Sequence, residues 1–179
     1  MAATDLQIAQ LALQNIGDRF DITSLDEASP EAEQVALVYD HVRDMLLREH
    51  PWGFAKRFTN PAALVGTPPD DWLYMFTYPA DALKVTRIVN PAGRKALPIE
   101  FAVGRNADNN KVLMCNLEEP EIEYIKLITD AGMYDPAFVL AFALRLSAAI
   151  AMPITGDRGS MLEMRQLASE AVSLAKSED

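Results

Sequence analysis

The segment from Asp135 to Pro153 reads DPAFVLAFALRLSAAIAMP, and it decides how the rest of the chain is organised. After its first residue, the only polar side chains are Arg145 and Ser147. A helix that is apolar on nearly every face is normally buried on nearly every face. Because the apolar run is shorter than the roughly 20 residues of a membrane span, we expect a central core helix that ends or kinks at Pro153. Inside it, the Arg145 guanidinium must find an acidic partner or reach the surface.

Helix starts are marked in four places by a capping residue that precedes apolar residues at helical spacing. The expected helices are residues 5–16 after a capping box of Thr4 and Gln7, residues 30–49 after Ser29, the central helix from Pro136 to about Met152 after Asp135, and a last helix after a capping box of Ser160 and Glu163. The other three helices are expected to pack around the central one.

Residues 56–130 differ in character, because they hold most of the prolines and most of the β-favouring runs. Residues 83–89 alternate with period two, which is typical of a half-buried strand. Further strands are expected within residues 73–78, 99–103, 112–115 and 122–128. The polar stretch Gly104–Asn110 lies between two of these strands and is expected to form a hairpin tip.

The expected fold class is therefore α+β, with a four-helix bundle core and an inserted antiparallel β-sheet of four or five strands between the second and third helices. The bundle would use residues 1–55 and 131–179, and the β-rich subdomain would use residues 56–130. A chain of 179 residues fits one domain that carries a sizeable insertion.

The chain is acidic, with a formal net charge of −10. Proteins that hold nucleic acid through its phosphates normally carry the opposite sign, so tight DNA binding is not expected. An acidic surface could instead repel DNA and let it slide past. The single cysteine, Cys115, cannot form an internal disulfide and has no Cys or His neighbour at metal-ligand spacing, which fits a reducing compartment and a half-buried strand thiol.

No group of residues points to catalysis, a metal or a cofactor. His41 is expected to be a solvated helix residue, and His50 precedes a proline at a bend. The loop Gly156–Ser160 lacks the spacing of a phosphate-binding loop. The many carboxylates include the cluster Glu118–Glu123, but nothing singles out an acid and base pair. The sequence therefore favours a protein that is not an enzyme.

Several short motifs follow one another along the chain. They are Ile16-Gly17, the run LLREHPWGFA at residues 46–55, WLY at 72–74, YPAD at 78–81, and YDPAF at 134–138 leading into ALRLSAAIA at 143–151. In this order and spacing the chain resembles the head-to-tail adaptor proteins of tailed bacteriophages, the connectors of the tail tubular protein A type. The similarity spans nearly the whole chain.

This resemblance implies a virion structural protein. Adaptors of this family form a ring, usually of about twelve copies, beneath the portal at the head–tail junction. The expected partners are other copies of the chain, the portal protein and a tail nozzle or tail tube protein. DNA would pass through the channel without specific binding, and neither a membrane nor a cofactor is implied. Assembly would take place in the host cytoplasm.

Two other classes of protein stay open at this point. One is a different virion part, such as a head-completion or tail-terminator protein. The other is a small acidic enzyme or regulatory domain, which would need converging polar groups in a concave site.

The candidate interaction surface has an aromatic part and a polar part. Aromatic side chains are favoured at protein interfaces, and loop tips often carry function. The candidate residues are Trp52, Trp72, Tyr74, Phe76, Asn106, Asp108, Asn109 and Asn110. Trp52 could instead anchor the bend after the second helix in the core. By strand alternation, half of the other aromatic residues could face inward.

Overall fold

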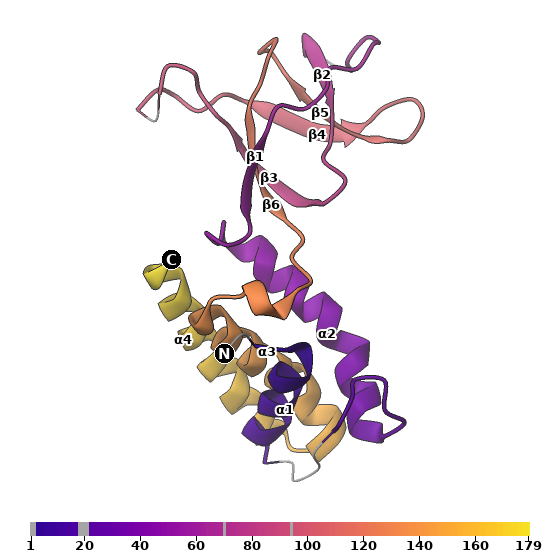
Figure 1. Cartoon of the computed structure of the whole chain (residues 1–179), viewed down its shortest axis with the longest axis vertical. Coiled ribbons are helices and arrows are strands. Elements are labelled where there is room, and N and C mark those ends of the chain that lie inside the picture. Colours follow the sequence, from indigo (N-terminus) through magenta and orange to yellow (C-terminus); the bar gives the residue numbers. More distant parts are fainter. Residues whose placement is uncertain (1–2, 18–21, 70, 94) are drawn as a thin grey trace. The chain divides into compact units, whose positions relative to one another are not determined.

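The computed structural model describes residues 3–17, 22–69, 71–93 and 95–179 and has a mixed α+β fold (Figure 1). The chain divides into two compact units. A helical unit comprises Met1–Phe54 and Ile128–Asp179, and a β unit comprises Ala55–Leu127. The described helices are α1 (Asp5–Asn15), α2 (Pro30–Glu49), α3 (Pro136–Thr155) and α4 (Arg158–Glu178), with a short 3₁₀ helix η1 (Ala131–Met133). The described strands are β1 (Lys56–Thr59), β2 (Tyr74–Thr77), β3 (Ala82–Ile88), β4 (Phe101–Arg105), β5 (Lys111–Cys115) and β6 (Ile122–Lys126).

The first three helices begin at the capping residues that the sequence predicts. Thr4 Oγ1 accepts a hydrogen bond from the Gln7 backbone N–H at 3.2 Å, and the Gln7 side chain accepts one from the Thr4 backbone N–H at 3.1 Å. This reciprocal capping box confirms the start of α1. Ser29 and Asp135 cap α2 and α3 by a single side-chain oxygen, which accepts from the backbone N–H of Ala32 and of Ala137, and each cap is followed by proline at the first helical position.

The end of α3 differs from the prediction. The helix continues through Pro153 to Thr155 instead of ending near Met152. The missing N–H of a proline removes one hydrogen bond, but the last turn is still held by Thr155 Oγ1, which donates to the Ala151 carbonyl at 2.7 Å. Gly156 then adopts the left-handed conformation, with φ at 67°, and closes the helix.

The start of α4 also differs from the prediction, which placed the cap at Ser160. Asp157 is the N-cap, and its carboxylate accepts hydrogen bonds from the backbone N–H groups of Gly159 at 2.8 Å and Ser160 at 3.2 Å. Because Asp157 already satisfies the first free N–H groups, the helix starts at Arg158 and Ser160 lies within its first turn.

With 20 residues, α3 is long and apolar enough to cross a membrane by length and composition alone, so the length argument against a membrane span is wrong. Its packing in the helical unit is that of a core helix. It lies against α1, α2 and α4 (Figure 1), and the side chains of Phe138, Phe142 and Leu146 are fully buried.

The core of the helical unit contains an aromatic cluster centred on Phe138. The ring centroids of Trp52, Phe54 and Tyr134 lie 5.1, 5.0 and 5.0 Å from that of Phe138. The two polar atoms in this cluster have partners: the Trp52 indole N–H donates to the Leu46 carbonyl at 3.0 Å, and the Tyr134 hydroxyl donates to the Ile128 carbonyl at 2.8 Å. Trp52 therefore anchors the bend after α2 in the core.

The β unit contains two antiparallel three-stranded sheets, with strand orders β1-β6-β3 and β2-β5-β4, so the expectation of one sheet of four or five strands is wrong. Where the chain passes from β3 to β4, an isolated bridge pairs Ile88 with Ile99. The connecting residues 89–98 include Pro91 and Pro98, which have no N–H to donate to a sheet. One cluster of buried side chains joins the sheets, with Phe76 and Leu113 on one side and Val85 and Ile122 on the other.

The second face of the sheet β2-β5-β4 is also covered. Met75, Val112 and Met114 form a buried cluster against which Leu64 and Trp72 pack. The chain before β2 folds back along that strand, where the Leu64 N–H donates to the Met75 carbonyl at 2.8 Å. Strand β5 is therefore buried on both faces, and its last residue, Cys115, is buried rather than half-buried.

Candidate interaction surface

The hairpin tip between β4 and β5 is held by a network of its own hydrogen bonds. The Asn106 side-chain oxygen accepts from the Asn110 N–H at 2.9 Å, and the Asn106 N–H donates to the Asn110 carbonyl at 3.0 Å. The Asn109 N–H donates to the Asn106 carbonyl at 2.9 Å, with Asn109 at a φ of 63°. Arg105 Nη1 donates to the Asn109 carbonyl at 2.6 Å. The tip therefore has one defined conformation, which reduces the entropy that binding a partner would cost.

Two hollows flank this tip, and Asn106 lines both of them. The first, of about 440 Å³, lies towards Tyr78, Asn110 and Lys111. Two of its lining residues are in contact, with Lys111 Nζ 3.6 Å from the centroid of the Tyr78 ring in a cation–π contact. The second, of about 330 Å³, lies towards the loop 65–69.

The polar part of the predicted surface is thus brought together. Asp108, Asn109 and Asn110 are exposed, and Asn106 is half-buried because its side chain is used within the tip. The fully exposed Val65 lines the second hollow and adds an apolar element that the sequence analysis did not identify.

The aromatic part of the predicted surface is not brought together. Trp52 and Phe76 are each 1% exposed, and each belongs to the core of its own unit, so neither is available to a partner. Trp72 is half-buried over the outer cluster of the β unit. Tyr74 is half-buried against the inner cluster, with its ring centroid 6.4 Å from that of Phe76. The candidate surface is therefore the tip and its two hollows rather than an aromatic face.

Lys111, Tyr78 and Arg105 are the site residues that sequence reasoning missed. The tip Gly104–Asn110 was identified by its polar composition. Arg105 lies within this stretch but was not singled out, whereas Lys111 and Tyr78 lie outside it. Lys111 directly follows the tip in the sequence and was recognisable as a charged neighbour. Its pairing with Tyr78 depends on strand β2 lying next to β5, which no local pattern predicts.

The two units differ sharply in charge. The sequence of the helical unit contains seven Lys and Arg residues against seventeen Asp and Glu residues, a net charge of −10. The sequence of the β unit contains nine of each, a net charge of zero. The entire net charge of the chain therefore resides in the helical unit.

The acidic groups of the β unit near Pro120 lie beside two further hollows. Glu118 and Glu119 line both, one of about 420 Å³ and the other of about 380 Å³. Both carboxylates are exposed, as is Glu121, but Glu123 of the same cluster is buried on β6 and forms an ion pair with Arg87, so the cluster is not uniformly solvated. Among the described residues, no group of three or more His, Cys, Asp or Glu side chains converges as a metal site.

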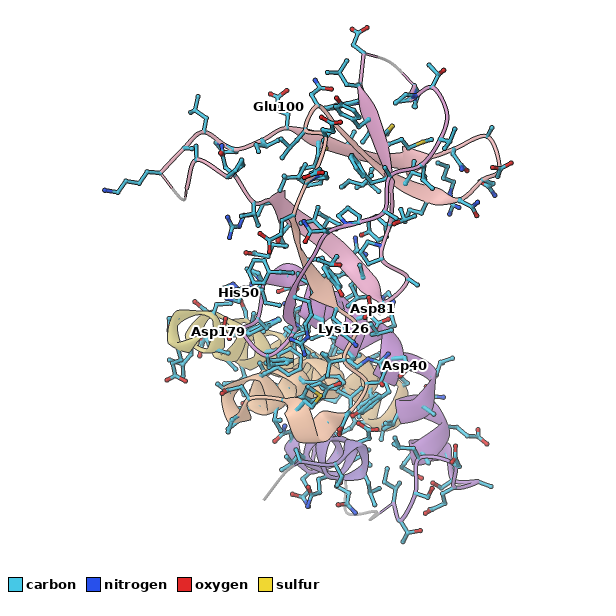
Figure 2. All side chains as sticks on the ribbon, turned by 45° about the horizontal axis from the view of Figure 1, so that its top comes forward. Asp40, His50, Asp81, Glu100, Lys126 and Asp179 are labelled. Carbon is cyan, nitrogen blue, oxygen red and sulfur yellow. The ribbon has the colours of Figure 1, made fainter. Side chains whose placement is uncertain are left out.

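The histidines take different positions. His41 is exposed on α2, as the sequence predicts. His50 ends α2 in an extended conformation, and its Nε2 atom lies 3.2 Å from an Asp179 carboxylate oxygen (Figure 2). The same carboxylate accepts from the Gly53 N–H at 2.8 Å, so it holds the bend rather than activating a nucleophile.

The strongly perturbed ionisable groups lie in the helical core. Burial raises the pKa of the Tyr39 hydroxyl far above its ordinary value, and the Asp5 carboxylate, 2.9 Å away, raises it further. Burial likewise raises the pKa of Tyr134. Both hydroxyls donate hydrogen bonds within the core, and neither lines the hollows beside the tip. These shifts therefore result mainly from burial in the core, and they do not indicate a reaction at the candidate surface.

No protein-family model matches the sequence, and no curated protein matches it at a significant level.

Proposed function

We propose that this protein is a virion structural component, a head-to-tail adaptor that forms a ring beneath the portal of a tailed bacteriophage. In this proposal the four helices form the bundle core, and the paired sheets are inserted between α2 and α3. The order of motifs along the chain supports the assignment to this class. The ring would extend the DNA channel and provide the docking platform for the tail.

The observation that carries the proposal is the division of charge between the two units. A channel must let the genome move, so its wall should not bind phosphates tightly. The helical unit, with a net charge of −10, has the sign that repels a DNA duplex and keeps it centred. We therefore assign the channel lining to the helical unit.

The neutral β unit is better suited to protein contacts. It has no net negative charge that would repel an acidic neighbour. Its tip is already fixed by internal hydrogen bonds. The hollows on either side of Asn106 could receive side chains of a partner. We assign this tip to contact with the tail nozzle or tail tube protein.

The direct test is to mix the purified full chain with the portal ring of the same phage and to measure the mass of the complex. The expected result is a discrete assembly that carries about a dozen copies of the chain. The absence of binding to an intact portal would contradict the adaptor proposal. In that case, binding to isolated tail proteins would identify a head-completion or tail-terminator protein instead.

A further inference from the structure

The two edges of the sheet β2-β5-β4 differ in their backbone hydrogen bonding. The outer edge of β2 is occupied by the preceding segment, because Leu64 and Ala62 form backbone hydrogen bonds with Met75 and Thr77 at 2.8 and 2.9 Å. Strand β4 forms the other edge. No described residue of the β unit forms a backbone hydrogen bond with the outer side of β4 between Phe101 and Arg105.

The hydrogen bonds at the tip define which backbone groups of β4 point outward. The Asn106 N–H donates to Asn110, its partner in the register that pairs Phe101 with Cys115 and Arg105 with Lys111. In an antiparallel pair, the residues that bond to the partner strand alternate with those that do not. Residues 102, 104 and 106 therefore point their N–H and C=O groups towards β5, and residues 101, 103 and 105 point theirs away from it.

This outer edge lacks most of the usual protection against pairing. Edge strands are commonly protected by proline, bulges or charged side chains, and the one charged residue of β4 is Arg105 at its end. Strand β3 has two register shifts, one at Ala82/Lys84 and one at Val85/Arg87, whereas β4 pairs in continuous register and contains no proline. At the centre of β4, the apolar side chain of Val103 is 43% exposed.

We propose that this edge pairs with the same edge of a second copy of the chain, as antiparallel β4 strands related by a two-fold axis at Val103. In this register Val103 lies opposite Val103 of the second copy, and Phe101 lies opposite Arg105. All three outward-pointing residues then meet in hydrogen-bonded pairs, and each pair exchanges two backbone hydrogen bonds. The result is a continuous six-stranded sheet across the two copies.

The side chains of β4 favour pairing with β4 of a second copy over pairing with an unrelated strand. The valines form an apolar contact at the axis, and the apolar stem of Arg105 lies against the Phe101 ring of the second copy. No like charges face each other directly in this register. The contact is isologous and stops at two copies, so it is distinct from the head-to-tail contacts of a ring. It does not depend on the proposed adaptor function.

The test uses the symmetry of the contact, in which residue 103 meets itself. Native mass spectrometry and analytical ultracentrifugation of the full chain, at up to about 0.1 mM, should show a dimer. Val103→Lys and Val103→Glu each place like charges at the axis, and each variant should have the mass of one copy. A one-to-one mixture should restore a dimer that contains one copy of each variant. The control Val103→Thr keeps the β-branched shape and should stay dimeric.

Three results would contradict the proposed contact between two β4 strands. If the wild-type chain has the mass of one copy, self-pairing is wrong and the edge is left for a strand of another protein. If the mixture of charge variants stays monomeric although both variants unfold near the wild-type temperature, residue 103 does not lie on a two-fold axis. A dimer that both charge variants retain would overturn this register. Binding to the portal is measured separately, so failure of the dimer is distinguishable from failure of the adaptor proposal.

Discussion

The guanidinium of Arg145, in the apolar helix α3, forms an ion pair with the carboxylate of Glu49 at the end of α2, with Nη2 3.0 Å from Oε2. Lys176 of α4 reaches the same oxygen at 3.2 Å. The sequence required Arg145 to find an acid or the surface, and the structure confirms both, because its side chain is also 30% exposed. One carboxylate thus ties three helices together.

Glu49→Gln should lower the free energy of unfolding by about 1 kcal/mol, because it removes the charge that compensates two partly buried cations. The value stays near the upper limit for surface pairs, since water still reaches all three side chains. Urea denaturation gives the measurement. Glu178→Gln, at an exposed position in the same unit, is the control and should change stability by less than about 0.5 kcal/mol. Equal effects of the two variants would contradict the role of Glu49.

The same carboxylate should contribute to the pH dependence of stability. Burial opposes ionisation of Glu49, but the hydrogen bonds and charges of Arg145 and Lys176 outweigh it and lower its pKa below the ordinary value of 4.5. A lowered folded-state pKa means that the stabilisation is present above the unfolded-state pKa and is lost as the pH falls through the folded-state value. The difference in stability between wild type and Glu49→Gln should therefore be constant near pH 7 and shrink below about pH 4.5. A difference that grows on acidification would rule this out.

The β unit also contains a carboxylate with several hydrogen bonds. Glu123 on the central strand β6 is 6% exposed, and one of its oxygens accepts from Arg87 Nε at 3.0 Å and Nη2 at 2.7 Å. The other oxygen accepts from the Thr86 hydroxyl at 3.0 Å. In the variant Glu123→Gln, the side-chain NH₂ group would face the donors of either Arg87 or Thr86, and donor would meet donor.

Glu123→Gln should therefore lower the free energy of unfolding by about 2 kcal/mol. The loss is smaller than for a fully buried pair, because Arg87 is 40% exposed and water can solvate it. Thermal unfolding of the full chain gives the comparison. Glu121→Gln lies two residues away at an exposed position and should leave stability nearly unchanged. If both variants unfold like the wild type, the hydrogen bonds of Glu123 contribute little.

Local sequence patterns predicted the parts of the fold that depend on short-range chemistry. The starts of α1, α2 and α3 were predicted because each cap needs only a side-chain oxygen and a backbone N–H two or three residues away. The start of α4 was missed because two possible caps, Asp157 and Ser160, compete within four residues. The β4–β5 hairpin was predicted because its polar tip separates two apolar strands.

The parts that were missed depend on long-range packing. The division of the strands into two sheets follows from the pairing of β6 with β1 and β3. These strands are far apart in the sequence, so no local periodicity predicts their pairing. The burial of Trp52 and Phe76 follows from the cores they join, so an aromatic residue alone could not show whether it serves a core or an interface. The tip was found by composition, whereas the Lys111–Tyr78 contact beside it required the pairing of β2 with β5.

If the helical unit lines the channel, removing its exposed acids should affect DNA passage. The triple variant Glu33→Gln, Glu163→Gln, Glu170→Gln changes exposed positions of this unit. Weaker repulsion should let the duplex contact the wall, so DNA exit from assembled particles should slow. Time-resolved fluorescence of DNA release gives the rate. The matched control neutralises the three exposed β-unit acids Glu118, Glu119 and Glu121, and an equal effect of that control would argue against the helical lining.

If the hairpin tip contacts the tail, its internal order should matter for tail attachment and not for portal binding. Asn106→Ala removes the side-chain oxygen that accepts from the Asn110 N–H and should loosen the tip without touching the cores of the two units. Because a loosened tip must be ordered on binding, tail attachment should weaken by about tenfold, which corresponds to about 1.4 kcal/mol. The measurement is the fraction of portal-bound rings that acquire a tail protein. Ala107→Ser, an exposed change that leaves every hydrogen bond of the tip in place, is the matched control. Tail attachment of Asn106→Ala at the wild-type level would remove the tip from the interface, whereas parallel loss of portal and tail binding would show that the tip serves assembly of the ring itself.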